Sequence, residues 1–297
     1  MVGPTAAGKS GLAQELAERF DADIVSVDSM QVYRGMDIGT AKSTLAERQR
    51  VPHHLIDVAD PDEDYSVARY RADAAAALSD LADRRRRVLM VGGTGLYLRA
   101  VVDQLDLPGQ WPEVRARLEI EADELGVPAL HARLSSLDPV AASRAEPANR
   151  RRVVRALEVC VGSGRPFSSF GPGLSAYPDT GFVLLGLNRP REELAERIAR
   201  RYQEQMAAGF LEEVAGLAGR PAGLSRTARQ ALGYRELLAH LAGDVGLDEA
   251  LDAAIRRTRT FARRQQAWFG RDPRIRWLEP AGNLVSVAAA ALGEWWR

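Results

Sequence analysis

Apolar residues near the start of the chain recur with the spacing of an α-helix. Leu12, Leu16 and Phe20 are four residues apart, with alanines beside them. Residues four apart lie one above the other on a helix, so this stretch predicts an amphipathic helix with one buried face. The pattern then changes, because residues 24–27 form a β-branched run that is typical of a buried strand.

The same alternation of helix and strand patterns continues to about residue 110. Residues 54–58 and 88–91 are short apolar runs that predict two further strands. Between them, Ser66 is placed to cap a helix that we expect to extend to about Asp83. Helices that alternate with buried strands are typical of a parallel sheet covered by helices. We therefore predict an α/β fold for this part of the chain.

The middle of the chain has helical patterns without a convincing strand. A stretch rich in Gly, Pro and Ser follows at 162–178, and residues 182–187 then predict a return to the sheet. The remaining elements are expected as helices at 191–208, 228–241 and 247–269 and a short strand at 275–278. We therefore predict an α/β core formed by residues 1–110 and 179–297, with a mostly helical insertion domain at 111–178.

The loop before the first helix has the spacing G-x-x-x-x-G-K-[ST] of a phosphate-binding P-loop. In such a loop the backbone N–H groups and the lysine hold phosphate oxygens, and the Ser10 hydroxyl can hold a Mg²⁺ ion. A chance match in a chain rich in Gly and Ala is the alternative, and the helix that follows argues against it. The parallel sheet is therefore predicted to be of the P-loop NTPase type. The loop consists of Gly3, Pro4, Thr5, Ala6, Ala7, Gly8, Lys9 and Ser10.

Lysine is nearly absent outside this loop. Lys and Arg total 40, yet the only lysines are Lys9 and Lys42. A compact ammonium fits between phosphate oxygens where a planar guanidinium does not, so position 9 has a chemical requirement for lysine. Only Met1 and Val2 precede Gly3, whereas a P-loop ordinarily follows a buried strand. We expect either that the true start lies upstream or that the central strand is cut short.

Composition limits the class of protein. The 40 basic residues are balanced by 40 acidic ones, so any nucleic-acid site must be a local patch rather than a global field. A single cysteine, Cys160, excludes an internal disulfide framework and a Cys-rich zinc module. No apolar run approaches the roughly 20 residues of a membrane span. We expect a cytoplasmic monomer with no membrane association.

Two polar residues follow predicted strands. Asp28 comes directly after residues 24–27, and Thr94 follows residues 88–91 through two glycines. The carboxyl ends of parallel strands meet at one edge of the sheet, where ligands bind. Asp28 could hold Mg²⁺ or act as a general base, and the sequence does not separate these roles. Thr94 could contact a ligand or cap the next helix.

Arginines cluster on three of the predicted helices. Such faces can follow a phosphate backbone, although for any one residue a solvated helix face is the alternative. From the residues alone, three functions stay open: phosphoryl transfer, nucleotide-controlled binding of RNA, or another reaction at a diphosphate. The clusters are Arg150, Arg151, Arg152 and Arg155; Arg197, Arg200 and Arg201; and Arg256, Arg257, Arg259, Arg263 and Arg264.

Longer sequence motifs narrow the function further than the arginine clusters and single residues do. The chain contains, in this order, GPTAAGKS, IVSVDSMQVYRGMDIGTAK, PHHLIDV, VGGTGLY, RRVVRALEV, MAAGFLEEV, QALGYRE and RTRTFARRQQAWF. Together they resemble the bacterial tRNA dimethylallyltransferase family. The resemblance implies transfer of a dimethylallyl group from dimethylallyl diphosphate to the exocyclic N6 amine of the adenosine 3′-adjacent to the tRNA anticodon, with release of diphosphate and with Mg²⁺ as cofactor. Related enzymes that prenylate free adenylate are an alternative, which the helical insertion disfavours.

The resemblance also implies roles for single residues. Asp28 is the expected general base, and Thr94 is expected beside the reacting atoms. The diphosphate would be held by the P-loop, Gly3 to Ser10, together with Arg197 and Arg201, and Mg²⁺ by Ser10. The helical insertion would grip the anticodon stem-loop. The residues expected to bind tRNA are Asp28, Ser29, Met30, Gln31, Thr94, Arg117, Arg151, Arg152, Arg155, Gln230, Gly233, Tyr234 and Arg235.

Overall fold

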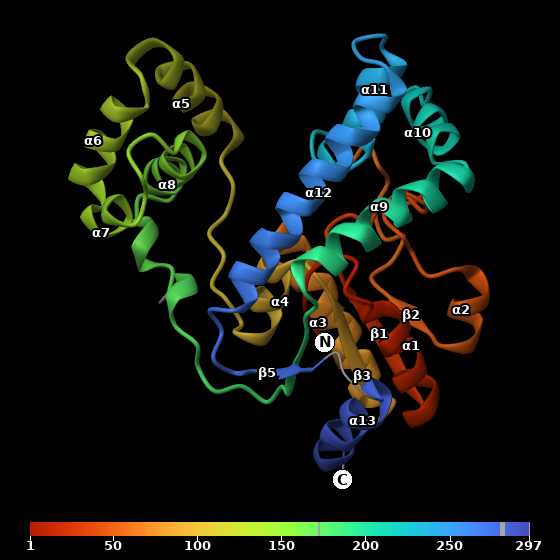
Figure 1. Ribbon diagram of the computed structural model, residues 1–297. Helices are drawn as coiled ribbons and strands as arrows, with labels where there is room; N and C mark the ends of the chain where they lie inside the picture. Colours follow the sequence, from red (N-terminus) through yellow and green to blue (C-terminus); the bar gives the residue numbers. More distant parts are fainter. Residues whose placement is uncertain (172, 280–282, 297) are drawn as a thin grey trace. The chain divides into compact units, whose positions relative to one another are not determined.

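The computed structural model describes residues 1–171, 173–279 and 283–296. The chain forms two compact units, one of Met1–Val102 with Thr180–Arg297 and the other of Asp103–Asp179. The first unit contains the strands and the phosphate-loop motif, and the second is helical (Figure 1). Among the described residues, no helix combines the length and the apolar character that crossing a membrane requires.

The larger unit is built on parallel strands. Strand β1 (Ala22–Val27) lies between β2 (His53–His54) and β3 (Arg87–Gly92) and pairs in parallel with both. Strand β4 (Leu184–Leu187) pairs in parallel with β5 (Ile275–Leu278). The strands expected around residues 24–27, 88–91, 182–187 and 275–278 are therefore confirmed, and with them the α/β fold class.

Two residues at the start of the chain join the two sets of strands. Val2 forms parallel bridges to Gly92 on one side and to Gly186 on the other. Its N–H donates to Leu185 O at 2.8 Å, and its carbonyl accepts from Leu187 N at 2.8 Å. The central position of the sheet, directly before the P-loop, is therefore held by a very short extended segment.

The alternation of side chains along the strands separates two cores. On one face, Ile24 and Leu89 pack with α1 (Lys9–Phe20) and α13 (Leu284–Trp295). On the other face, Val25 and Met90 pack with α3 (Val67–Asp83), α4 (Gly95–Val102) and α12 (Leu247–Phe269). Helix α9 (Arg191–Ala207) packs against α12, and both can be followed in Figure 1. The helix predicted from the apolar stripe of Leu12, Leu16 and Phe20 is confirmed as α1, and those predicted at 66–83, 191–208 and 247–269 are confirmed within a few residues.

Two expectations for this unit were wrong. The strand predicted at 54–58 is limited to β2, because Leu55 and Asp57 have left-handed backbones with φ of 60° and 58°, which end the extended conformation. The helix predicted at 228–241 is divided into η3 (Ala228–Gln230) and α11 (Tyr234–Leu241) by Gly233, whose φ is 85°. Two further helices were not predicted, α2 (Leu45–Arg50) and α10 (Phe210–Ala218).

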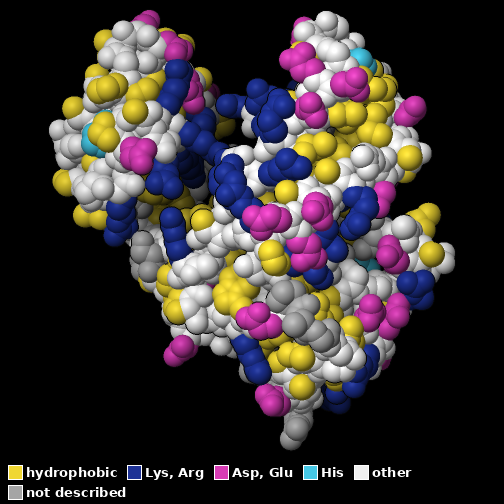
Figure 2. Space-filling model, viewed as in Figure 1, with side chains coloured by type: hydrophobic (Ala, Val, Ile, Leu, Met, Phe, Trp, Pro, Cys, Tyr) yellow, Lys and Arg dark blue, Asp and Glu magenta, His cyan; other side chains and the backbone are white. Residues whose placement is uncertain are grey.

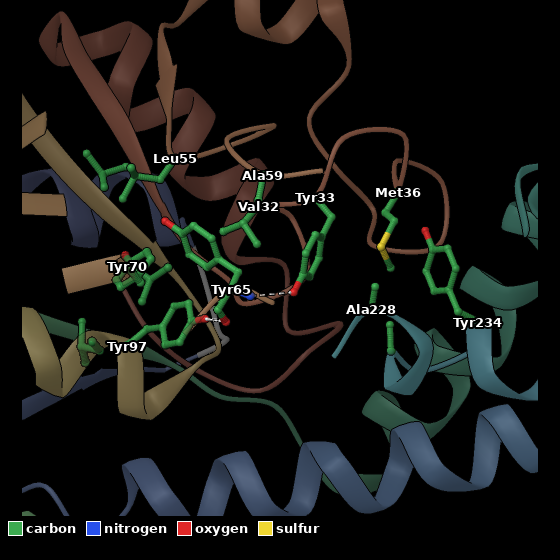
Figure 3. Close-up of a cluster of buried hydrophobic side chains, with 14 of the residues drawn as sticks. Val32, Tyr33, Met36, Leu55, Ala59, Tyr65, Tyr70, Tyr97, Ala228 and Tyr234 are labelled. Atoms are coloured by element: carbon green, nitrogen blue, oxygen red, sulfur yellow. Dashed lines mark hydrogen bonds between the residues drawn. The ribbon is translucent and has the colours of Figure 1, made fainter. Parts of the chain in front are cut away.

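Tyrosines fill much of the core below the loop that follows β1 (Figure 3). The rings of Tyr70 and Tyr97 stack with centroids 4.2 Å apart. The Tyr70 hydroxyl donates to Ser26 O at 3.0 Å, and the Tyr65 N–H donates to the Tyr33 hydroxyl at 3.3 Å. Buried hydroxyls need partners. Tyr70 finds its partner on β1, and Tyr33, which belongs to the loop after β1, finds its partner at Tyr65 before α3, so these bonds fix the loop on the core.

The smaller unit is a set of helices with its own core. Leu118, Leu130, Leu134 and Leu157 are buried there, and Cys160 is buried beside them, as expected for a structural cysteine. Burial raises the pKa of the Cys160 thiol, which makes it less reactive. The helices are α5 (Pro112–Leu125), α6 (Val127–Leu137), α7 (Pro139–Ser143), α8 (Arg150–Ser163), η1 (Phe167–Ser169) and η2 (Gly173–Ser175).

Candidate active site

The P-loop has a backbone that depends on its glycines. Gly3 has φ of 145°, and a Cβ added there would lie 2.1 Å from Leu187 O, so any larger residue would displace the neighbouring strand. Gly8 has φ of 99° and precedes the first turn of α1. Ala6 adopts a left-handed φ of 64°, a conformation that costs energy without glycine. The loop therefore directs its N–H groups and the N-terminus of α1 to one point, which suits an anion.

Lys9 is buried beneath this loop. Its ammonium donates to Pro4 O at 2.7 Å. Burial lowers the pKa of Lys9 from its ordinary 10.5 to about 8, the nearby Asp28 carboxylate opposes that shift, and Arg201 adds to it. Asp28 is therefore close enough to Lys9 to act on its charge, and a bound anion would restore the ordinary preference for the charged form.

Three arginines hold the loop from outside. The guanidinium groups of Arg197 and Arg189 donate through Nε to Ala6 O and Ala7 O, each at 2.7 Å. Arg201 donates through Nη1 to the Thr5 hydroxyl at 2.8 Å. Arg197 and Arg201 were expected at the diphosphate. Arg189 was not, because it precedes α9 and belongs to none of the arginine clusters.

Arg201 is the least satisfied of these cations. Its Nε has no hydrogen-bond acceptor within the part of the chain that the structure describes. Burial lowers the pKa of Arg201, and the Asp28 carboxylate is among the groups that oppose the shift. A buried donor without a partner is costly, so this group favours a ligand that brings an acceptor.

Gln265 of α12 connects the P-loop to the turn after β3. Its Oε1 accepts from Thr5 N at 2.8 Å, and its Nε2 donates to Gly93 O at 2.8 Å. The sequence reasoning missed this residue. A signal was present, since Gln265 occupies a buried position in an otherwise mainly apolar stripe of α12.

Asp28 lies directly after β1, in a turn that its own carboxylate closes. Its Oδ1 accepts from Met30 N at 2.8 Å and from Gln31 N at 3.4 Å. Ser29 N donates to the Thr94 hydroxyl at 3.1 Å, which ties the ends of β1 and β3 together. Asp28 and Thr94, both expected from the sequence, therefore belong to one cluster of loops at the carboxyl edge of the sheet.

These groups surround a cavity of about 230 Å³. Most of its polar lining was predicted: Thr5, Ala6, Gly8, Lys9, Ser10, Asp28, Gln31, Arg197 and Arg201 all face it. Gln265, Phe261, Thr40 and Ala41 also line the cavity, and Thr94 is one residue beyond the lining residue Gly93. Cations, a phosphate loop and a carboxylate thus share one space, as group transfer from a phosphorylated donor requires.

The donor set of this cavity fits a magnesium ion that a diphosphate shares. Ser10 is exposed and lines the cavity with Asp28, and both carry the oxygen ligands that Mg²⁺ prefers. The described residues contain no group of three or more His, Cys, Asp or Glu side chains that could hold a metal by themselves. Phosphate oxygens and water would have to supply the remaining ligands, which is the usual arrangement for Mg²⁺.

The residues expected to bind RNA are divided between the two units. In the larger unit, Gln230 and Arg235 are exposed, while Gly233 and Tyr234 are buried. In the smaller unit, Arg117, Arg151 and Arg152 are exposed. Arg155 is half-buried and donates to Pro108 O and Gly109 O at 2.9 and 3.0 Å.

A further basic surface follows α12. Figure 2 shows Lys and Arg side chains along the stretch of surface that α12 occupies in Figure 1. Arg256, Arg259, Arg263 and Arg264 are exposed on this helix, and Arg257 pairs with Glu236 of α11. A helix that exposes several guanidinium groups is suited to a phosphate backbone.

A sequence profile of the IPP transferase family matches residues 31–272. The chain belongs to this family. The tRNA dimethylallyltransferase of Streptomyces avermitilis is 50% identical over 293 residues, which are 98% of this chain and 93% of that relative. The corresponding enzyme of Geobacter metallireducens is 47% identical over 296 residues. The resemblance found in the motifs is therefore confirmed.

Solved structures agree with the sequence comparison. The full-length tRNA isopentenylpyrophosphate transferase of Bacillus halodurans has a TM-score of 0.72 at 38% identity, over 99% of this chain and 94% of that one. A eukaryotic dimethylallyltransferase acting on tRNA has a TM-score of 0.81 at 25% identity, over 99% of this chain and 77% of that one. The fold of this IPP transferase family member is thus shared across bacterial and eukaryotic relatives.

Proposed function

We propose that this protein transfers a dimethylallyl group from dimethylallyl diphosphate to the exocyclic N6 amine of the adenosine 3′-adjacent to the anticodon of tRNA, and releases diphosphate. The observation that carries the proposal is that Lys9, Arg201 and Asp28 line one and the same cavity. Family membership and relatives named tRNA dimethylallyltransferase support this reaction over phosphoryl transfer.

The donor diphosphate would occupy the P-loop end of the cavity. Backbone N–H groups of the loop would donate to its oxygens, and Lys9, Arg197 and Arg201 would neutralise its charge. Ser10 would hold Mg²⁺, which would supply further positive charge to the leaving diphosphate. Negative charge grows on this group as the bond to the prenyl carbon breaks, so each of these contacts strengthens in the transition state.

The transfer forms one bond and breaks one. The N6 amine attacks the first carbon of the dimethylallyl group, the bond from that carbon to the diphosphate oxygen breaks, and its electron pair leaves with the diphosphate. The amine must then lose a proton. Asp28 is the carboxylate in the cavity that can accept it, because Met30 N and Gln31 N hold its Oδ1 and fix its orientation. Thr94 secures this turn through Ser29 N.

The acceptor base must leave its stack to reach this cavity. We propose that the exposed arginines Arg117, Arg151 and Arg152 contact the anticodon stem-loop from the helical insertion, with Arg155 behind them. On the α/β unit, the turn of Ser29, Met30 and Gln31 and the segment of Gln230, Gly233, Tyr234 and Arg235 would contact the same RNA. We further propose that the protein acts as a monomer in the cytoplasm, where tRNA is modified.

Labelled dimethylallyl diphosphate tests the reaction. The protein is incubated with Mg²⁺ and an anticodon stem-loop that carries consecutive adenosines after the anticodon. We expect label on the N6 of the first of these adenosines. A stem-loop with guanosine at this position serves as the matched control and should stay unlabelled. Label on free AMP at a comparable rate would instead indicate an adenylate prenyltransferase, and no label on any acceptor would refute the proposal.

A further inference from the structure

Glu213 of α10 makes an unusual set of contacts that the reaction described above does not use. It lies in the motif MAAGFLEEV and outside the cavity lining. Its Oε2 accepts from Asp37 N at 2.8 Å and from Ile38 N at 2.7 Å. Its Oε1 accepts from Gly39 N at 3.1 Å and from the Tyr234 hydroxyl at 2.6 Å. One carboxylate thus holds three consecutive backbone amides and a phenol.

The segment that Glu213 holds is fastened on its other sides as well. Gln205 of α9 donates through Nε2 to Ile38 O at 2.6 Å. The Lys42 ammonium pairs with Asp37 at 2.7 Å. A Cβ added to Gly39 would lie 2.2 Å from the Phe210 ring and 2.5 Å from the Tyr234 ring, so the backbone itself packs on these aromatics. Figure 3 shows Met36, the residue directly before this segment, beside Tyr234.

The same segment forms part of the cavity wall. Thr40 and Ala41 line the cavity directly after the three amides that Glu213 holds. Gln31 donates through Nε2 to Thr40 O at 3.2 Å, and Gln31 N donates to Asp28 Oδ1 at 3.4 Å. Hydrogen bonds, joined by the Gly39–Thr40 backbone and by Gln31 itself, therefore connect Glu213 through this wall to the carboxylate that we propose as the base.

We propose that Glu213 is a positioning residue for the transfer: its carboxylate fixes residues 37–39 so that Thr40, Ala41 and Gln31 form the donor cavity beside Asp28. This inference rests on the proposed function. It requires a carboxylate in particular, because four donors converge on the two oxygens. A glutamine would present its NH₂ group to some of these donors and leave them without an acceptor.

The test compares E213Q with E212Q, which removes an exposed carboxylate from the same turn of α10. Steady-state kinetics with dimethylallyl diphosphate and the anticodon stem-loop should show the KM for the donor raised about tenfold or more in E213Q. The E212Q control should stay within about twofold of the wild type, since its carboxylate meets solvent. Amide hydrogen exchange at residues 37–39 should be faster in E213Q alone.

Tyr234→Phe gives a milder variant that keeps the carboxylate and the ring packing. It removes one of the four donors, so we expect a rise of about threefold in the donor KM. This variant replaces E213Q if the latter does not fold. A donor KM that is unchanged in folded E213Q, or in Y234F where E213Q fails to fold, would overturn the inference.

The two proposals fail in different ways. A wild-type protein that transfers no label refutes the proposed function. In that case calorimetric titration with dimethylallyl diphosphate still tests the role of Glu213. The cavity should bind this probe about tenfold more weakly in E213Q than in E212Q. Equal binding to both variants would overturn it.

Discussion

The cations of the cavity and those of the helical insertion are held in opposite ways. In the cavity, Lys9 and Arg201 are buried, and burial lowers the pKa of each. In the insertion, Arg150 pairs with Glu119 at 2.8 Å and with Asp123, and hydrogen bonds to these carboxylates raise its pKa. Arg201 keeps its buried Nε without an acceptor among the described residues, whereas Arg150 is paired with carboxylates of its own unit.

This difference separates two kinds of anion binding. Buried cations around a preformed loop bind a compact and highly charged group such as a diphosphate, at some cost to the stability of the empty protein. Exposed arginines such as Arg151 and Arg152 bind an extended backbone through long-range and salt-sensitive attraction. The same residue types therefore perform different tasks, and four experiments, taken in order of decreasing effect, test this division.

Replacing Lys9 tests whether this buried charge lowers the stability of the empty protein while it strengthens donor binding. Lys9→Met should lower kcat/KM for dimethylallyl diphosphate by about 10²–10³-fold, as for loss of one preorganised charge at a developing anion. It should also raise the free energy of unfolding of the empty protein by on the order of 1 kcal/mol, because a buried charge is replaced by an apolar chain. Steady-state kinetics and thermal unfolding measure the two effects. The control is Arg19→Met, which removes an exposed cation from the last turn of α1.

A Lys9→Met protein that unfolds at a lower temperature than the wild type would break the comparison. It would mean that Lys9 stabilises the empty loop through its hydrogen bond to Pro4 O, and that its burial does not destabilise the protein in the absence of a ligand.

Gln265→Leu tests the link between the P-loop and the turn after β3. The change leaves Thr5 N and Gly93 O without their partner, so we expect kcat/KM for the donor to fall about 10–100-fold. RNA affinity, measured by filter binding, should stay the same. Gln266→Leu is the matched control, because the Gln266 amide donates to Asn188 Oδ1 and Arg189 O and not to the P-loop or Gly93. Equal losses of kcat/KM in the two variants would show that Gln265 has no specific role in the site.

The pH dependence of donor binding follows from Lys9. Its pKa of about 8 means that the free protein loses this charge as the pH rises through 8, so donor affinity should fall by up to about tenfold per pH unit above that point. The unfolded chain keeps the ordinary pKa of 10.5 and binds more protons between pH 8 and 10.5. Lys9 therefore contributes a rise in the free energy of unfolding with pH in this window. Calorimetry with dimethylallyl diphosphate measures the first effect.

The Lys9→Met protein should lack this pH dependence of donor binding. An identical dependence of donor affinity on pH in both proteins would show that a group other than Lys9 titrates.

The smallest effect is expected from the exposed arginines of α8. Arg151→Gln and Arg152→Gln should each weaken stem-loop binding severalfold and reduce the salt slope by about one. The KM for the donor should not change. Arg133→Gln serves as the control, because Arg133 lies in the same unit and pairs with Glu121 at 2.8 Å. A change in donor KM, or no change in RNA binding, would contradict the division between the two sets of cations.

The sequence was informative where local chemistry determines the structure. The G-x-x-x-x-G-K-[ST] spacing requires a loop before a helix, and the apolar runs before Asp28 and Thr94 led to the correct strands. The sequence was less informative where contacts between distant segments determine the local structure. The 54–58 run is apolar enough for a strand, but left-handed residues at Leu55 and Asp57 bend it into the loop that supplies Asp57 to Lys42.

Residues contributed by distant segments were the hardest to predict. Arg189 and Gln265 bond to the P-loop from 182 and 260 residues away. The periodicity of apolar and polar residues carries no information about contacts between segments so far apart in the sequence. The polar residue in the buried stripe of α12 was the available sign for Gln265, whereas Arg189 had none. Glu213 was visible within a motif, but its role depends on three amides of a loop that α10 meets only in the folded chain.

In the proposed mechanism, Asp28 accepts the proton of an amine that attacks a donor held by buried cations. The most direct measurement is single-turnover transfer of labelled dimethylallyl to the anticodon stem-loop by wild-type and Asp28→Asn protein, each saturated with both substrates. We predict that the variant binds donor and RNA nearly as well as the wild type but transfers about 10²–10⁴-fold more slowly. Transfer by Asp28→Asn at the wild-type rate would contradict the account.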